Sequence, residues 1–287
     1  MTEAGGRRLG AHVTRGVRHA RWTARSRMAE HPAYLGIARR RQGAAVVSEA
    51  TDLVIDGFPR SASTFAVVAF QLAQPRLVRL GHHVHAPGQI IRAVGLGVPV
   101  LLTVRPPEDT VLSLVIREPY VTIRQGLGAY ARFYERLLGY RDGMVVADFP
   151  EVTRRLERSI RRVNARFGTD FAAIELTPER TRECFDLIEM RSRRPPWRGT
   201  IHDFLTGLVP LAELERQAAA YPAAVIAAVA EDQAARPSDH RERRKDALRA
   251  AYHGRAHARL RERADELHAT FAAAGAGELA GKSSQLM

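Results

Sequence analysis

The sequence predicts an α/β protein in which helices cover both faces of a central parallel sheet, followed by a helical C-terminal part. Two observations predict this class. Short apolar runs alternate with helix-like segments between residues 52 and 167, and strands that alternate with helices form mostly parallel sheets. The run at Pro99–Val104 is also almost entirely apolar, which is typical of a strand buried on both faces. The expected architecture therefore has three layers, α/β/α.

Each apolar run leads through a loop into a helix-like segment. The first run ends at Gly57 and enters a Pro/Ser/Thr loop, a composition typical of turns. Pro107 suits a helix start, and Glu108 and Asp109 suit the positive end of the helix dipole. The predicted strands are Asp52–Gly57, Leu77–Gly81, Pro99–Val104 and Met144–Ala147. The predicted helices are Phe65–Gln74, Gly88–Val94, Glu108–Arg117, Tyr120–Leu138, Glu151–Phe167 and Ala247–Ala274, with a mainly helical region at Thr177–Pro237.

The composition favours a protein that binds an anion. The chain has 287 residues and a formal net charge of +13, nearly all from arginine, because lysine occurs only at Lys245 and Lys282. Such a balance favours a nucleotide, a polyanionic acceptor, nucleic acid or a membrane surface as partner. The single cysteine, Cys184, excludes an internal disulfide framework and a thiolate zinc cluster.

The sequence predicts a cytoplasmic protein without a transmembrane segment, since it contains neither a long uncharged apolar run nor a signal-peptide core. We expect three parts. Residues 1–48 form a basic helical N-terminal extension, with ten arginines against two acids in residues 1–42. Residues 49–275 form the main domain, and the Gly/Ser-containing residues 276–287 form a flexible tail.

The first chemical motif is the loop from Gly57 to Phe65, GFPRSASTF, between a predicted strand and a predicted helix. It departs from the nucleotide-binding pattern GxxxxGK[ST], because Ala62 and Ser63 replace the second glycine and the lysine. Amide groups at a helix N-terminus nevertheless attract anions, and Arg60 can donate a charged fork of hydrogen bonds. The alternative is an ordinary turn that caps a helix.

The second motif runs from Arg105 to Ser113. Arg105 follows a predicted strand directly, at the end where open parallel sheets bind ligands. Ser113 lies one to two turns into the next predicted helix, from where its hydroxyl can face the same anion. A generic arginine at a strand end is the alternative interpretation.

A third motif, GHHVHAP, places His82, His83 and His85 in one loop. A metal site, an ordinary histidine-containing loop and a catalytic base are the three interpretations of this cluster. The spacing is a weak metal pattern because no carboxylate or thiolate adjoins it.

Along the chain, the histidine motif lies between the loop at Gly57–Phe65 and the motif at Arg105–Ser113. In that chain order, the three motifs resemble the family of sulfotransferases that use 3'-phosphoadenosine 5'-phosphosulfate (PAPS). FPRSASTF is similar to the family's FPKSGTTW-type loop, with Arg60 for lysine and Ala62 for glycine. The side chain of Ala62 restricts φ and the approach of a ligand. The resemblance covers residues 52–167 and extends thinly to Phe204, and it implies a P-loop-like fold and PAPS as the donor, with no metal required.

The resemblance also assigns roles to residues. It implies that Arg60, Ser61, Ala62, Ser63, Thr64 and Phe65 bind the 5'-phosphosulfate end of the donor, with Phe65 placed to stack on adenine. Arg105 and Ser113 would bind the 3'-phosphate, and Asp109 would be structural. Trp197–Phe204 looks like a shortened RKGxxGDW segment, which makes Arg198 and Gly199 donor ligands. His85 would be the general base, and Arg60 would stabilise the leaving phosphate.

Two other classes remain open at this stage. A small-molecule kinase would use the same sheet and loop, but Arg60 and Ala62 argue against it. A nucleic-acid-binding protein or an inactive homologue would explain the charge, although few aromatic residues accompany the basic ones. For a sulfotransferase, the expected acceptor of the sulfuryl group is a hydroxyl of a glycan, lipid or small molecule. The many arginines favour an anionic or glycan acceptor. The sequence leaves open whether the protein forms a homodimer.

Overall fold

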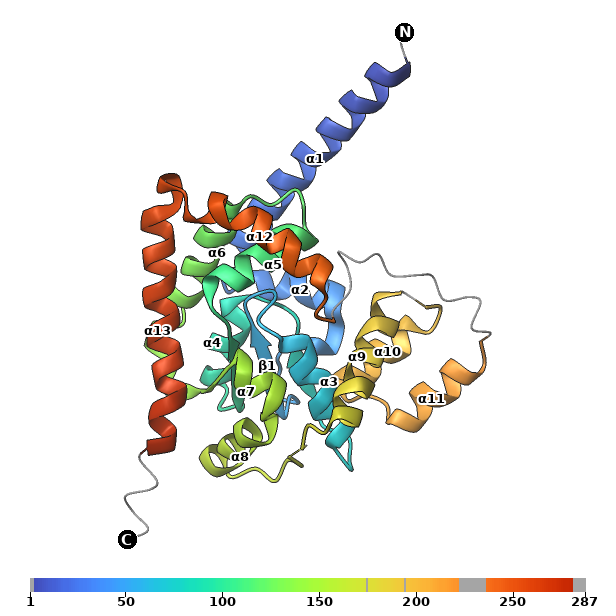
Figure 1. Cartoon of the computed structure of the whole chain (residues 1–287). Coiled ribbons are helices and arrows are strands. Elements are labelled where there is room, and N and C mark those ends of the chain that lie inside the picture. The colour runs from blue at the N-terminus through green and yellow to red at the C-terminus, as the bar shows by residue number, and fades with distance from the viewer. Residues whose placement is uncertain (1–2, 174, 194, 222–235, 281–287) are drawn as a thin grey trace.

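The protein has a four-stranded parallel sheet between layers of helices, which confirms the predicted α/β class (Figure 1). The computed structural model describes residues 3–173, 175–193, 195–221 and 236–280. The strand order is β2-β1-β3-β4, and each neighbouring pair is parallel. The strands are β1 (Leu53–Gly57), β2 (Leu80–His82), β3 (Val100–Val104) and β4 (Val145–Asp148).

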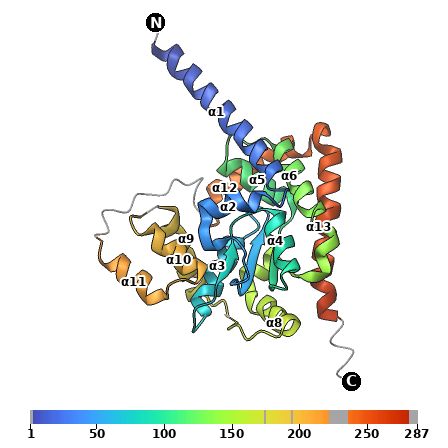
Figure 2. The same cartoon turned by 180° about the vertical axis from the view of Figure 1, so that it is seen from behind.

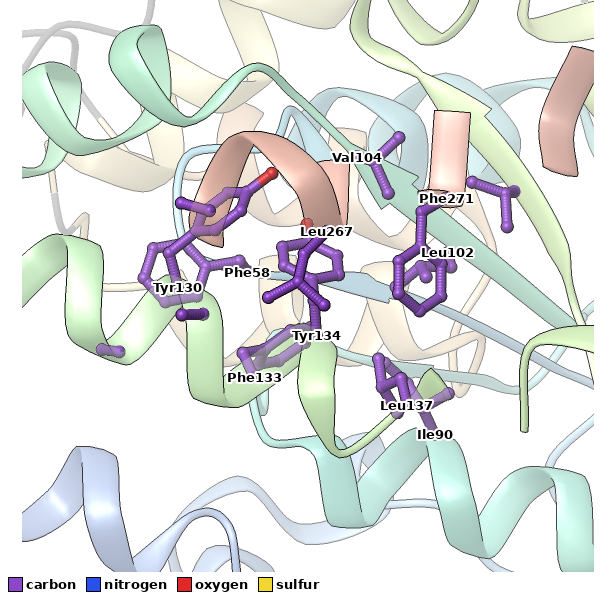
Figure 3. Packing of buried hydrophobic residues seen from close by; sticks show 14 of the residues in the cluster. Phe58, Ile90, Leu102, Val104, Tyr130, Phe133, Tyr134, Leu137, Leu267 and Phe271 are labelled. Atoms are coloured by element: carbon purple, nitrogen blue, oxygen red, sulfur yellow. The ribbon is translucent and has the colours of Figure 1, made fainter. Parts of the chain in front are cut away.

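The sheet separates two hydrophobic clusters, because alternate residues of a strand point to opposite faces. Val54 and Leu102 belong to the cluster under α4 (Pro87–Gly95), α5 (Pro107–Arg117), α6 (Ile123–Glu135) and α13 (Ala258–Ala280). Ile55 and Leu101 belong to the other cluster, under α3 (Ser63–Ala73), α8 (Leu156–Phe167), α9 (Pro178–Ser192) and α10 (Arg198–Thr206). Figure 3 shows the first cluster, in which Leu102 and Val104 of β3 lie near Phe271 of α13. The three-layer prediction is therefore confirmed.

The strands and helices of the N-terminal half match the prediction to within a few residues, but two predicted helices are each broken in two. The segment predicted as one helix, Glu151–Phe167, forms α7 (Phe149–Arg154) and α8, separated at Arg155, which has φ −147° and ψ 39°. The Asp148 side chain accepts a hydrogen bond from the Glu151 amide and starts α7 early. The break lets Glu151 meet Arg162 of α8 at 2.8 Å.

The C-terminal helix also differs from its prediction. The segment predicted as one helix, Ala247–Ala274, is divided between α12 (Asp239–His253) and α13, with Gly254 in an extended conformation between them. Glycine has a low helix propensity, which explains the break. The flexible tail predicted for residues 276–287 is wrong for residues 276–280, which continue α13, while residues 281–287 lie outside the described part of the chain.

The predicted N-terminal extension is helical. It consists of α1 (Glu3–Met28), α2 (Tyr34–Gln42) and the short 3₁₀ turn Gly43–Ala45. The first turns of α1 extend beyond the rest of the molecule in both views, whereas its last turns lie against the body (Figures 1 and 2). Across the described part of the chain, none of the helices combines the length and the apolar character that a membrane crossing requires.

The mainly helical region predicted for Thr177–Pro237 contains α9, α10 and α11 (Leu211–Ala219), and its residues 222–235 lie outside the described chain. These helices lie on the opposite side of the molecule from α13 (Figures 1 and 2). Gly57, the last residue of β1, pairs with Thr103 near the end of β3. The loops that follow these two neighbouring strands therefore leave the same edge of the sheet, where open α/β sheets bind ligands.

Candidate functional site

A cavity of about 700 Å³ opens at the carboxyl ends of β1 and β3. Its walls come from both sequence motifs after these strands, from the histidine loop after β2, and from α1, α6, α9 and α12. The volume is in the range of small-molecule sites. The structure thus brings together segments that are more than 200 residues apart in the chain. The predicted site residues that line the cavity are Arg60, Ala62, Ser63, Thr64, Phe65, His85, Arg105 and Ser113.

The loop after β1 has a strained backbone. Arg60 and Ala62 both have positive φ, at 75° and 72°, a conformation that costs a residue with a side chain about 1–2 kcal/mol. His83 and His85 also have positive φ, at 56° and 52°. Within the described ranges these four are the non-glycine residues with positive φ, and all four line the cavity. Strain of this kind concentrates at functional sites.

The N-terminus of α3 points its amide groups toward the cavity. Its first residues, Ser63, Thr64 and Phe65, line the cavity, and the amides of a first helical turn have no acceptor within the helix. Ala62 occupies the N-cap position and its side chain forms no capping hydrogen bond. The amides and the helix dipole together favour an anion at this place.

Ser61 is the exception in this loop. It was predicted to be a donor ligand, but its side chain is fully buried and does not line the cavity. Its Oγ lies 2.7 Å from Oγ1 of Thr103, and its amide donates to the carbonyl of Phe58. The hydroxyl of Ser61 therefore holds the loop against β3, and its amide closes a turn within the loop, so neither group faces a ligand. Gly57 is required in the same contact, since a Cβ there would lie 2.3 Å from the Thr103 carbonyl oxygen.

Three arginines converge near the Ser113 hydroxyl on α5. Nε of Arg60 donates to Oγ of Ser113 over 2.9 Å, and Nη2 of Arg241 donates to the same atom over 3.0 Å. Arg105 donates to the carbonyl oxygen of Arg60 over 3.3 Å. The Nε of Arg105 is buried and has no hydrogen-bond partner. Arg60 and Arg241 thus share one neutral hydroxyl, and Arg105 has a buried donor without an acceptor. An anion with several acceptor oxygens would suit this arrangement.

The electrostatics of this cluster support the same interpretation. Burial, followed by the charges of Arg241, Arg117 and Arg105, lowers the pKa of Arg60 to about 9. Burial also lowers the pKa of Arg105, although Asp109 and Glu242 oppose the effect. At pH 7 these side chains keep their protons, but the charged forms lack full compensation. A bound anion would relieve this repulsion.

Asp109 pairs with two basic side chains and is not among the residues that line the cavity. One of its carboxylate oxygens lies 3.0 Å from Nζ of Lys245 and 3.6 Å from Nη2 of Arg105. Burial opposes ionisation, but the hydrogen bond from Lys245 and the charge of Arg105 hold the pKa of Asp109 below its usual value. The carboxylate therefore positions two basic side chains at the edge of the cavity.

Sequence reasoning missed most of the basic residues of the cavity, among them Arg191 on α9, and Arg241 and Lys245 on α12. Arg241 and Lys245 are buried, which is rare for such residues unless they have partners. The dense basic stretch that begins at residue 241 was a signal in the sequence. It did not show which of those residues turn inward.

Arg198 and Gly199, also predicted from the resemblance, do not reach the cavity. They are exposed at the start of α10 and do not line it. Arg241, which was not predicted, lies beside Ser113. Phe65 does line the cavity, where its ring packs 5.3 Å from that of Phe185.

His85 is held by two groups from β1. Its Nδ1 lies 2.8 Å from the carbonyl oxygen of Gly57 and 3.1 Å from Oδ1 of Asp56. The carbonyl can only accept a hydrogen bond, so Nδ1 carries the hydrogen and Nε2 of the neutral ring carries the lone pair. His85 lines the cavity with one fifth of its side chain exposed. This arrangement suits a general base.

His83 has a different environment. Arg191 donates from Nη1 to Nε2 of His83 over 3.0 Å, and Oγ1 of Thr64 lies 2.7 Å from the same nitrogen. A guanidinium cannot accept a hydrogen bond, so the lone pair of Nε2 is already used. Burial, together with the charge of Arg191, lowers the pKa of His83 well below its usual value. His83 therefore fixes the position of Thr64 and is poorly placed to act as a base.

His82 is fully buried behind His83, with its Nδ1 2.6 Å from Nδ1 of His83 and its Nε2 3.2 Å from Oγ1 of Thr206. Burial lowers the pKa of His82 well below its usual value. The described part of the chain contains no group of three or more His, Cys, Asp or Glu side chains arranged to hold a metal ion.

Comparisons with family models, curated proteins and solved structures found no match to this chain. The protein is an α/β protein with a cavity at the carboxyl edge of a parallel sheet, and several basic side chains line that cavity.

Proposed function

We propose that this protein transfers a sulfuryl group from PAPS to the hydroxyl of an acceptor. One observation carries the proposal: Arg60 and Arg241 meet at Ser113, with Arg105 bonded to the backbone of Arg60, next to the uncapped N-terminus of α3. The cavity therefore offers two adjoining sets of anion-binding groups with Arg60 between them. A nucleotide that carries separate 3' and 5' phosphates matches two such sets. The order of the sequence motifs supports the same donor.

The residues that would hold the donor fit its charges. Arg105, Ser113 and Arg241 would bind the 3'-phosphate, and the unpartnered Nε of Arg105 would gain an acceptor. The amides of Ser63 and Thr64 would bind the 5'-phosphate and its sulfuryl oxygens. Arg60 reaches both sets, since its backbone belongs to the loop and its side chain contacts Ser113.

The donor supplies a sulfuryl group attached to a phosphate oxygen. During transfer, the acceptor oxygen forms a bond to sulfur, while the bond from sulfur to the phosphate oxygen breaks and leaves its electron pair on the phosphate. Nε2 of His85 takes the proton of the acceptor hydroxyl. Arg60 and the amides of α3 stabilise the charge that develops on the phosphate. Asp56 and the Gly57 carbonyl keep the imidazole oriented throughout.

Calorimetry with 3'-phosphoadenosine 5'-phosphate tests the donor site directly. We expect binding that needs no magnesium, that exceeds the binding of ATP, and that weakens by about 10- to 100-fold in Arg105→Ala, because hydrogen bonds to charged groups contribute about 1.5–3 kcal/mol. ATP with magnesium is the control ligand. A preference for ATP with magnesium would favour the kinase interpretation, and the absence of nucleotide binding would contradict the proposal.

A further inference from the structure

The cavity has an apolar end that the donor site does not use. Its walls come from α1 and the turn after it, from α5 and α6, and from the loop after β1. The residues that form it are Trp22, Ala29, Phe58, Leu114, Ala129 and Phe133. All six belong to, or pack against, buried hydrophobic clusters of the protein. The basic residues at and beside Ser113 come from the loops after β1 and β3 and from α12.

We propose that this apolar end binds the acceptor, and that the acceptor is a small neutral compound whose hydroxyl is attached to an apolar body about the size of one or two rings. The inference rests on the proposed function. It differs from the expectation drawn from the sequence, which favoured an anionic or glycan acceptor because of the arginines. It also gives the N-terminal extension a part in the site.

The position of His85 is the first argument. The residues on either side of it, Val84 and Ala86, are buried in one cluster with Ala29, in the turn after α1, and Tyr34 of α2. This turn therefore packs on the histidine loop, and Ala29 and His85 both line the cavity. A hydroxyl compound in contact with the turn would lie beside the imidazole that takes its proton.

The charges at this end are the second argument. Glu30, in the turn after α1, is paired with Arg132 of α6 at 2.5 Å, and the carboxylate of Glu118 accepts a hydrogen bond from the Tyr120 hydroxyl. Both carboxylates therefore have partners within the protein. Arg25 donates from Nε to the hydroxyl of Tyr34 over 3.1 Å and is the cation that an anionic acceptor would use. A neutral apolar body needs no such cation and gains from burial against the rings.

The rigidity of the wall is the third argument. Figure 3 shows Phe58 beside Tyr130 and Phe133, with Tyr134 behind them. The Phe58 ring lies 5.3 Å from that of Tyr130 and 5.8 Å from that of Phe133, both edge to face. Phe58 and Phe133 are buried, at 3% and 4% exposure, so they form a fixed floor. A preformed apolar surface suits a rigid apolar ligand better than a flexible, hydrated sugar.

Trp22 makes the inference testable, because it is half-buried on α1 and lines the cavity. The probe is 2-naphthol, a neutral compound with one hydroxyl, titrated into the full chain with 3'-phosphoadenosine 5'-phosphate present, by calorimetry and by quenching of tryptophan fluorescence. We expect 2-naphthol to bind, and Trp22→Ala to weaken it about tenfold or more while nucleotide affinity stays within about twofold. Val17→Ala, at an exposed position of the same helix, is the matched control and should change neither affinity.

The outcomes separate this inference from the proposed function. If the nucleotide binds but 2-naphthol does not, or Trp22→Ala leaves its affinity unchanged, the apolar acceptor site is wrong and the donor site stands. Binding of a sulfated disaccharide in place of 2-naphthol, abolished by Arg25→Ala, would also overturn it in favour of an anionic glycan. If the nucleotide does not bind, the proposed function fails, and this inference fails with it.

Discussion

Oδ1 of Asp56 lies 3.1 Å from Nδ1 of His85, and the two residues are joined a second time by a hydrogen bond from the His85 amide to Oδ2 of Asp56. Asp56 is fully buried at the end of β1 and also accepts hydrogen bonds from the amides of Gly57 and Val84. The carboxylate thus fixes both the backbone and the ring of the histidine. A buried acid that holds an imidazole in one tautomer is a known requirement of catalytic histidines.

The first prediction concerns this pair. His85→Ala should reduce turnover by about 10²- to 10⁴-fold, the usual contribution of a general base, with nucleotide affinity unchanged. Asp56→Asn should reduce turnover by about tenfold or more, because the neutral amide no longer stabilises the imidazolium that forms when His85 takes the proton. Nitrogen NMR of His85 should show Nδ1–H in both proteins, because the Gly57 carbonyl still accepts a hydrogen bond from Nδ1. Unchanged turnover in Asp56→Asn would contradict the assigned role.

The second prediction compares two arginines. Arg241→Ala should weaken binding of 3'-phosphoadenosine 5'-phosphate by about 10- to 100-fold, since the buried guanidinium beside Ser113 is removed. Arg198→Ala is the matched control, because Arg198 is exposed and does not line the cavity. The affinity of this variant for the nucleotide should stay within about twofold of wild type. The reverse order of effects would restore the role that the sequence resemblance assigned to Arg198.

The third prediction concerns the backbone at Ala62. Its φ of 72° is a conformation that glycine adopts at little cost. Ala62→Gly should therefore raise the free energy of unfolding by up to about 1 kcal/mol, the relief of strain less the added chain entropy. Ala66→Gly, one turn later inside α3, should lower it by about 1 kcal/mol or more. Urea denaturation of both variants measures the difference, and destabilisation by Ala62→Gly would show that the loop is not strained.

The fourth prediction concerns pH and stability. Burial lowers the pKa of His82 and of His83 well below 6.5, so both stay neutral in the folded protein while the unfolded chain takes up protons as the pH falls through 6.5. Stability contributed by these residues is present above pH 6.5 and is lost below it. The loss should approach about 1.4 kcal/mol per pH unit for each histidine.

Urea denaturation between pH 7.5 and 5.0 measures this dependence. His83→Gln should make the curve of unfolding free energy against pH shallower, whatever its effect on stability at pH 7.5. Parallel curves for wild type and His83→Gln would mean that His83 is protonated in the folded protein. The slope of the unfolding free energy against pH, and not its value at any one pH, therefore tests the prediction.

Much of the architecture was predictable because it depends on local sequence. The runs at β1 and β3 are apolar over a few consecutive residues, and a strand buried on both faces requires that pattern wherever it lies in the sheet. The start of α3 follows from the loop after Gly57, and the start of α5 follows from Pro107. The breaks at Arg155 and Gly254 were not predicted. The first accompanies the Asp148 cap that starts α7 early, and the second falls at a glycine, a residue that lowers helix propensity without always ending a helix.

The chemistry of the loops after β1, β2 and β3 can be recognised in the sequence: a loop with an arginine and hydroxyls before a helix, a loop with three histidines, and an arginine followed by a serine. The directions in which these groups face depend on tertiary packing. Packing turns Ser61 inward to Thr103, places Arg241 against a serine 128 residues away, and brings the turn after α1 against the histidine loop. Spacing along a chain constrains neighbours within a turn or a strand, whereas contacts between distant segments depend on how whole helices pack on the sheet.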